Sequence, residues 1–292
     1  MPIWVILTLL SAFSLATSDA LTKRVITRDN EYVIAWFRLV IPLPALGVAL
    51  LLSGPVPQMD RTYIVSFCAA VPLELGAIFL YYKALRISPL SLTLPFLSVT
   101  PVFLILFSLV IVGDPVSPAG AAGIVLIGLG GFTLNLSNLR AGLLGPFRAV
   151  VKERGSFYML SIALVYGFTS SLGKLAIDHS SAAFFGATYF LALALLLLPF
   201  IILRTGLARF PSSLRENARA ALLPGLFDAV ATLAHVYAMS MTNVAYMIAL
   251  KRTSLLMGSL YGFLLFGERQ VRERMTGAVL MFAGFVVIVL FS

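Results

Sequence analysis

Two carboxylates, Glu74 and Asp228, stand in the middle of long apolar stretches of the sequence. A charged side chain is costly in apolar surroundings and is usually found there because it faces a cavity or a partner. A desolvated carboxylate can carry a proton, and an ionised one can bind a cationic group. The two residues are therefore candidates for a proton or substrate site. The alternative is that each forms a buried ion pair or a hydrogen-bonded strut that fixes helix packing.

Helical spacing adds neighbours to each carboxylate. Residues four and seven positions further on lie on the same face of a helix. The two faces comprise Glu74, Ile78 and Tyr81, and Asp228, Thr232 and His235. If these faces meet, the sequence predicts a cavity lined by acidic and hydrogen-bonding groups.

Lys251 and Arg252 are a pair of cations in another apolar stretch. Adjacent residues of a helix point about 100° apart, so we expect at most one of them to face the cavity directly. Lys251 shares a helical face with Ser254, and this face could bind a carboxylate or a phosphate. Alternatively, both cations neutralise the carboxylates or extend toward the headgroups of the outer leaflet. If Lys251 and Asp228 both face the cavity, an amino-acid-like zwitterion would satisfy both.

Three other charged residues are candidates for structural ion pairs. Asp19, near the end of the first apolar stretch, is expected to pair with Arg38 or with Lys23. Arg252 is the third candidate, because it could neutralise Glu74 or Asp228. None of these pairs would require a ligand.

Pro95 and Pro101 lie within one apolar stretch. A proline frees a backbone carbonyl and bends a helix, so the pair could give a transport pathway the flexibility of a gate. A static bend is an equally good interpretation.

Other chemistry finds little support. Cys68 is the only cysteine, and the two histidines, His179 and His235, are far apart in the sequence. This leaves no metal-ligand spacing, no disulfide and no nucleophile constellation for an intramembrane enzyme. No phosphate-cradling GxxxxGK[ST] loop occurs, so we expect neither ATP hydrolysis nor a cofactor.

Long apolar helices must position these groups. Hydrophobic residues make up 60% of the 292 residues, charged residues 11%, and the mean hydropathy is +1.00. A soluble domain carries about twice that charged fraction. Because a spanning helix needs about 20 apolar residues, the sequence predicts an all-α polytopic membrane protein with ten spans. They are residues 3–22, 32–52, 62–82, 91–112, 118–138, 157–176, 184–203, 220–240, 247–266 and 276–291.

The chain repeats itself. Leu9–Ile26 matches Leu160–Ile177 at an offset of 151, and Gly123 and Gly130 match Gly277 and Gly284 at an offset of 154. At the second offset, Glu74 is equivalent to Asp228 and Tyr81 to His235. Each repeat holds five spans, so the second copy enters the membrane inverted, as in secondary transporters with a site at the repeat interface. The predicted units are residues 1–140, a cytoplasmic linker 141–156, and residues 157–292.

The net charge of +9 indicates topology rather than nucleic-acid binding. Nearly all Lys and Arg residues outside the spans fall in the odd-numbered connections, whereas the even-numbered ones carry only Arg61 and Lys174. Short basic connections remain in the cytoplasm. We therefore expect both termini outside, in a plasma membrane such as the bacterial inner membrane, with some basic residues contacting lipid headgroups.

Several motifs resemble those of the EamA family of the drug/metabolite transporter superfamily. They are Tyr82–Leu85, Pro95, Thr100–Pro101 and Gly113–Asp114, then Ala249–Ser254, Gly267–Glu268, Gly277 and Gly284, with Arg38 where the family often has arginine. The resemblance covers essentially the whole chain as two EamA units and implies a transporter. The sequence departs from the pattern at Asp114, where glutamate is usual, and at the basic pair Lys251-Arg252.

Together these features predict a secondary transporter of a small polar metabolite, with an amino-acid-like zwitterion or an amine favoured. Transport would occur by alternating access, coupled to protons or to exchange, and the resemblance favours export. The expected partners are the substrate, protons and membrane lipids, with the protein a monomer or weak dimer. The alternative is a flippase for a phosphate-bearing lipid or lipid-linked sugar, in which Lys251 and Arg252 would hold the phosphate.

Overall fold

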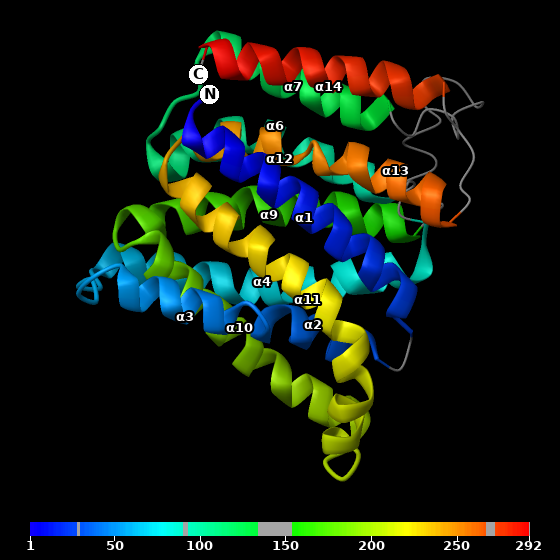
Figure 1. Cartoon of the computed structure of the whole chain (residues 1–292). Helices are drawn as coiled ribbons and strands as arrows, with labels where there is room; N and C mark the ends of the chain where they lie inside the picture. Colours follow the sequence, from blue (N-terminus) through cyan, green and yellow to red (C-terminus); the bar gives the residue numbers. More distant parts are fainter. Residues whose placement is uncertain (28–29, 90–92, 134–153, 267–271, 292) are drawn as a thin grey trace.

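The computed structural model describes residues 1–27, 30–89, 93–133, 154–266 and 272–291, and every regular element in these ranges is helical (Figure 1). The first half contains α1 (Ile3–Val25), α2 (Glu31–Val40), α3 (Leu43–Leu52), α4 (Arg61–Ile87), η1 (Leu94–Val99), α6 (Thr100–Phe107), η2 (Ser108–Val112) and α7 (Pro118–Thr133). The second contains α9 (Arg154–Asp178), α10 (Ala182–Thr205), α11 (Phe210–Ser240), α12 (Val244–Lys251), α13 (Ser254–Phe266) and α14 (Arg272–Phe291). The all-α fold class is confirmed.

Six of the described helices are long and apolar enough to cross a membrane. They are α1, α2 with α3, α4, α9, α10 and α11. The other four predicted spans correspond to shorter apolar helices, which are η1 to η2, α7, α12 with α13, and α14. Apolar side chains such as Leu51, Val110 and Leu203 are exposed, as expected of helices that face lipid.

Some boundaries differ from the prediction. Helix α11 begins at Phe210 rather than at residue 220, because the polar residues 210–219 extend the helix beyond its apolar part. Helix α9 begins at Arg154, so the last three residues of the predicted linker are helical. The rest of that linker, the end of the span 118–138 and the motif Gly267–Glu268 lie outside the described residues.

The predicted span 32–52 is interrupted at Ile41 and Pro42, between α2 and α3. Two further predicted spans are broken, and they occupy equivalent places in the two repeats. In the first, a 3₁₀ helix (η1) leads into α6 and then into a π turn (η2), with Pro95 and Pro101 in the first turns of η1 and α6. A proline fits such a position because the missing N–H would have no helical partner there. In the second, the helix is interrupted at Arg252 and Thr253, between α12 and α13.

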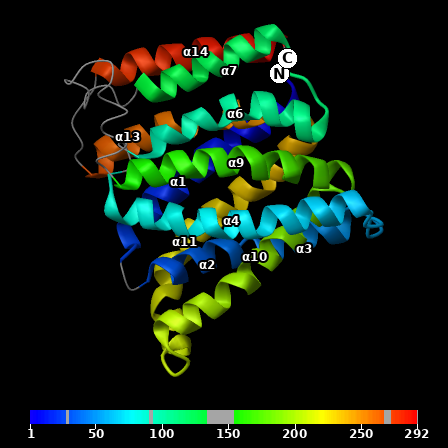
Figure 2. The same ribbon diagram turned by 180° about the vertical axis from the view of Figure 1, so that it is seen from behind.

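The helices pack around a pseudo-two-fold axis. Helix α1 lies along α11 and α4 lies along α9, and the repeat exchanges these two pairs because α1 is equivalent to α9 and α4 to α11 (Figures 1 and 2). Helices α7 and α14 are antiparallel neighbours at one edge of the bundle, and α2, α3 and α10 form the opposite edge. Both termini lie at the same end of the bundle. The inverted repeat predicted from the sequence is therefore present.

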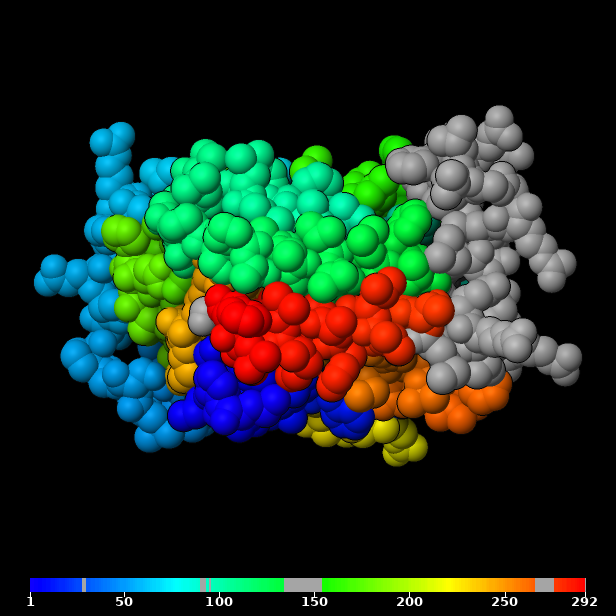
Figure 3. Space-filling view, turned by 90° about the horizontal axis from the view of Figure 1, so that it is seen from above, coloured from blue at the N-terminus to red at the C-terminus, as the bar shows by residue number. Residues whose placement is uncertain are grey.

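Helices α7 and α14 lie side by side on the face that Figure 3 shows, and glycines bring them into contact. A Cβ at Gly284 would lie 2.5 Å from the Gly123 carbonyl oxygen, and a Cβ at Gly130 would lie 2.7 Å from the Gly277 carbonyl oxygen. Gly130 is the repeat equivalent of Gly284, and Gly123 of Gly277. The two contacts are therefore equivalent and related by the pseudo-two-fold axis.

Serine hydroxyls join α1 to α11. Ser11 donates to the Ala231 carbonyl and Ser18 to the Pro224 carbonyl, each at 2.8 Å. These small residues allow the two helices to approach closely. As a result, Asp19 on α1 and Asp228 on α11 are brought to the same region of the bundle.

Candidate functional site

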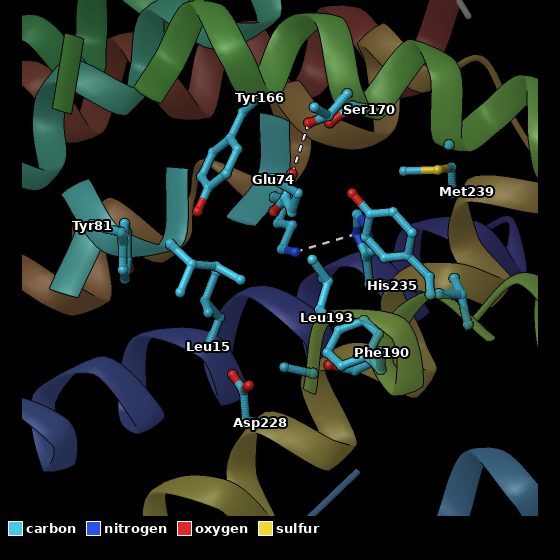
Figure 4. A pocket seen from close by; sticks show the side chains of 18 of the residues that line it. Leu15, Glu74, Tyr81, Tyr166, Ser170, Phe190, Leu193, Asp228, His235 and Met239 are labelled. Carbon is cyan, nitrogen blue, oxygen red and sulfur yellow. Dashed lines mark hydrogen bonds between the residues drawn. The ribbon is translucent and has the colours of Figure 1, made fainter. Parts of the chain in front are cut away.

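A cavity of about 230 Å³ lies between the two repeats. Its walls come from α1, α2, α4 and η1 of the first repeat and from α9, α10, α11 and α12 of the second. Figure 4 shows Glu74, Tyr166 and Ser170 on one side of it, Leu15 and Asp228 on another, and His235 and Phe190 on a third.

Most of the site residues predicted from the sequence line this cavity. They are Arg38, Glu74, Tyr81, Asp228, Thr232, His235, Lys251 and Arg252. Ser254, Pro101 and Asp19 are not among the lining residues. Asp19 forms an ion pair with Arg38, which does line the cavity. The side chain of Pro95 lies outside the described part of the chain.

Arg38 bridges two carboxylates from different helices. Its Nη1 lies 2.9 Å from Asp19 Oδ1 and its Nη2 lies 2.7 Å from Asp228 Oδ1. Tyr81 donates to the second oxygen of Asp19 at 2.6 Å. A planar guanidinium can make both charge-assisted contacts at once, which a lysine cannot do in the same geometry. The sequence predicts that Asp19 pairs with Arg38 or Lys23, and it allows Asp228 either a cavity role or a buried ion pair. In the structure both carboxylates pair with Arg38, and Asp228 also lines the cavity.

Glu74 is held differently. Thr169 donates to its Oε2 at 2.8 Å, and Tyr189 lines the same cavity. No cation lies within ion-pair distance of Glu74 among the described residues. Glu74 therefore faces the cavity with neutral partners only.

The repeat relates these two carboxylate sites. At the offset of 151, Arg38 corresponds to Tyr189 and Asp19 to Ser170, while Glu74 corresponds to Asp228 at 154. The same scaffold thus carries an arginine-bridged carboxylate on one side and a hydroxyl-bonded carboxylate on the other. Tyr189 was missed from the sequence, although extending the offset to Arg38 would have found it.

Lys251 and Arg252 both line the cavity, so the expectation that only one would face it is wrong. The reason is the helix break, because α12 ends at Lys251 and the chain turns at Arg252 before α13 begins. The same break separates Lys251 from Ser254, which lies in α13 and does not extend its helical face.

The two cations differ in their contacts. The Lys251 ammonium lies 3.2 Å from Nδ1 of His235 and makes no ion pair with a described carboxylate. Arg252 is 6% exposed, and its Nε has no hydrogen-bond partner among the described residues. The proposed neutralisation of Glu74 or Asp228 by direct contact with these cations is therefore not seen.

Aromatic and aliphatic side chains complete the cavity. Tyr82, Tyr166, Phe185 and Phe190 line it, and the Arg38 guanidinium lies 5.6 Å from the centre of the Tyr82 ring. Such a mixture of apolar walls and a few polar groups is typical of a binding site for a small molecule.

Comparisons with known proteins agree with this architecture. The profile of the EamA-like transporter family matches residues 2–136 and 153–290, once in each repeat. A solved structure titled only "Crystal structure of protein" is similar with a TM-score of 0.70 and 16% identity, and the match covers 98% of this chain and 96% of that chain. At that identity the likeness shows the fold alone. No curated protein matches the sequence significantly.

Proposed function

This chain belongs to the EamA-like transporter family of the drug/metabolite transporter superfamily, and we propose that it is a secondary transporter that moves a small polar metabolite by alternating access. As the sequence led us to expect, the favoured substrates are amino-acid-like zwitterions and amines. The protein is a multi-pass membrane protein, which we place in a plasma membrane.

The observation that carries this proposal is the charged cavity at the interface of the two repeats. Inverted-repeat transporters bind their substrate near the midplane, at the interface between the repeats and beside interrupted helices. Here the cavity lies beside the interruption between α12 and α13, and Glu74 and Asp228 both line it. Both carboxylates lie near the middle of their helices, α4 and α11.

The drive for transport would come from protons or from a counter-substrate. Glu74 is the carboxylate suited to carry a proton, since it accepts a hydrogen bond from the Thr169 hydroxyl and makes no ion pair with a described cation. Asp228 is less suited, because Arg38 holds it in an ion pair. We propose export as the direction, following the family likeness.

Alternating access would require the Arg38 bridge to open. The bridge joins α1 and α2 to α11, so it must break if these helices separate on one side of the cavity. The irregular segment around Pro95 and Pro101 would supply flexibility on the opposite side.

The test is uptake into proteoliposomes of a labelled panel of amino acids, amines, organic acids and nucleotide sugars, with and without a pH gradient. Accumulation of a zwitterion or amine that rises with the gradient would support proton coupling, and its loss in Glu74→Gln would show that transport requires Glu74. Exchange of substrate at a rate that does not depend on the pH gradient would support an antiporter. Failure to move any soluble solute would contradict the proposal and favour the lipid flippase.

A matched control for Glu74→Gln is Glu216→Gln. Glu216 lies on the polar extension of α11, away from the cavity-lining residues. We expect uptake to remain unchanged in this variant. Loss of uptake in both variants would mean that reconstitution, rather than the cavity, had been altered.

A further inference from the structure

We infer that the cavity binds a zwitterion with its carboxylate between Lys251 and Arg252 and its amine at Glu74, the rest of the molecule being a small apolar group. This inference rests on the proposed transport function and narrows its substrate class. It also excludes simple amines as substrates, although the sequence alone allows them.

The Arg252 guanidinium is the first reason. It is 6% exposed, lines the cavity, and leaves Nε without a partner among the described residues. No described carboxylate lies within ion-pair distance of it. A buried cation is retained at considerable cost unless something pairs with it. A ligand carboxylate is the natural partner, because it matches the planar fork of donors on arginine.

Lys251 strengthens the same site. Its hydrogen bond to His235 places the ammonium at 3.2 Å from Nδ1, but an imidazole does not neutralise that charge. The break between α12 and α13 brings the two adjacent cations to one wall of the cavity. Two cations without protein carboxylates among the described residues form a site for an anionic group.

Glu74 provides the opposite charge. Thr169 donates to its Oε2, and no described cation lies within ion-pair distance of the carboxylate. A ligand ammonium would supply a positive charge there. A ligand with a carboxylate and an ammonium group would therefore give a charged partner to Lys251, Arg252 and Glu74, none of which forms an ion pair with another described residue.

The formal charges of the site support a ligand without net charge. Arg38, Lys251 and Arg252 are balanced by Asp19, Glu74 and Asp228, and of these cations only Arg38 is paired directly, with two of the carboxylates. A zwitterion preserves this balance. A simple amine adds a positive charge in a cavity that already holds two cations without carboxylate partners, and it leaves both of them unpaired.

The size and walls of the cavity define the remaining group. A volume of 230 Å³ corresponds to about eight water-sized units, each of roughly 30 Å³. Phe185, Phe190 and Leu193 form an apolar wall. This suits an α-amino acid with a small aliphatic side chain.

Calorimetric binding to the protein in lipid nanodiscs tests the inference with three matched probes. These are leucine, 3-methylbutylamine, which lacks the carboxylate, and 4-methylpentanoate, which lacks the amine. We expect leucine to bind at least about tenfold more tightly than either analogue, because each analogue leaves a buried charge unpaired.

Single variants then assign the two ends. Arg252→Gln should weaken leucine and 4-methylpentanoate at least about tenfold and leave 3-methylbutylamine unchanged, whereas Glu74→Gln should weaken leucine and the amine but not the acid. Arg252→Lys should restore part of the affinity for leucine. Lys174→Gln removes a largely buried lysine outside the cavity and should change none of the three affinities.

Equal binding of leucine and 3-methylbutylamine would overturn the inference, as would an equal loss of all three probes in Arg252→Gln and Glu74→Gln. These results are distinguishable from failure of the transport proposal. Uptake of another solute without leucine binding would contradict only the substrate class, whereas leucine binding without any uptake or exchange would contradict only transport.

Discussion

Arg38 in the first repeat and Asp228 in the second form a buried ion pair, with Nη2 at 2.7 Å from Oδ1. The pair joins α2 to α11, and Arg38 forms a second ion pair with Asp19 of α1. The repeat equivalents of Arg38 and Asp228 are Tyr189 and Glu74, and Glu74 instead accepts a hydrogen bond from Thr169 and makes no ion pair with a described cation. The bundle is therefore symmetric in its backbone and asymmetric in its charges, and this asymmetry gives the two sides of the cavity different chemistry.

Replacing Arg38 should destabilise the protein strongly. Arg38→Met leaves Asp19 and Asp228 buried without a countercharge, and the loss of one partner of a buried pair costs about 3–5 kcal/mol of unfolding free energy. Arg38→Lys should recover only part of this, because an ammonium cannot bridge both carboxylates in the same way. Thermal unfolding in detergent measures the effect.

The control for Arg38 is Lys174→Gln. Lys174 pairs with Asp178 at 2.7 Å, but the Asp178 side chain is 39% exposed, so water can solvate it and loss of the pair should cost about 1 kcal/mol or less. Equal melting temperatures for wild type and Arg38→Met would show that the bridge does not hold α11 to the first repeat.

The glycine contacts between α7 and α14 predict a second difference in stability. Gly284→Ala places a Cβ 2.5 Å from the Gly123 carbonyl oxygen, so the two backbones must separate, at a cost of about 1–3 kcal/mol. Gly76→Ala is the matched control, because no other group lies within 4 Å of its Cβ position. Alanine favours a helix over glycine, so this control should be neutral or slightly stabilising. A Gly284→Ala protein as stable as Gly76→Ala would contradict the close approach.

The sequence predicts the helices, the repeat and the charged residues that line the cavity for identifiable reasons. Apolar length is enough to find a span, and a charge at mid-span is rare enough to mark Glu74 and Asp228. The repeat offset then relates the two carboxylates to each other from the residue numbers alone. The repeat offset would also identify Tyr189 as a candidate site residue, because Tyr189 is the repeat equivalent of Arg38.

Other features could not be predicted from sequence. The break at Arg252 and Thr253 carries no proline or glycine, so helical periodicity continues through it and predicts Ser254 in the cavity, where it is not among the lining residues. The partner of Asp228 lies 190 positions away in the chain, and only the packing of α2 against α11 decides that Arg38 reaches it. Local patterns carry no information about such contacts.

At the end of the bundle that holds the termini, Asp60 predicts a pH effect on stability. Its Oδ1 accepts from the Tyr63 N–H at 2.7 Å, capping α4, and its Oδ2 lies 2.6 Å from Nδ1 of His179. The Tyr63 N–H, followed by His179, lowers the pKa of Asp60 from its ordinary value of 3.8. A lowered pKa in the folded state stabilises the protein above pH 3.8, and this contribution is lost as the pH falls through the folded value.

The comparison of wild type with Asp60→Ala measures this contribution. The wild type should melt at a higher temperature at pH 6, and the difference should shrink as the pH falls below about 3.8. Asp60→Asn keeps the cap acceptor but does not titrate, so its difference from Asp60→Ala should be constant with pH. A wild-type difference that is equally constant would show that the Asp60 charge has no role.

The distribution of basic residues predicts the orientation in the membrane. Lys23 donates to the carbonyls of Leu85 and Ser88, and Arg86 pairs with Glu31, so basic side chains of two odd-numbered connections meet at one end of the bundle. Basic connections remain in the cytoplasm, so that end should be cytoplasmic and the end with both termini should be outside. Fusions to a reporter active only in the cytoplasm should be active after Arg140 and inactive after Ser292. An active fusion after Ser292 would contradict this orientation and place the end with both termini in the cytoplasm.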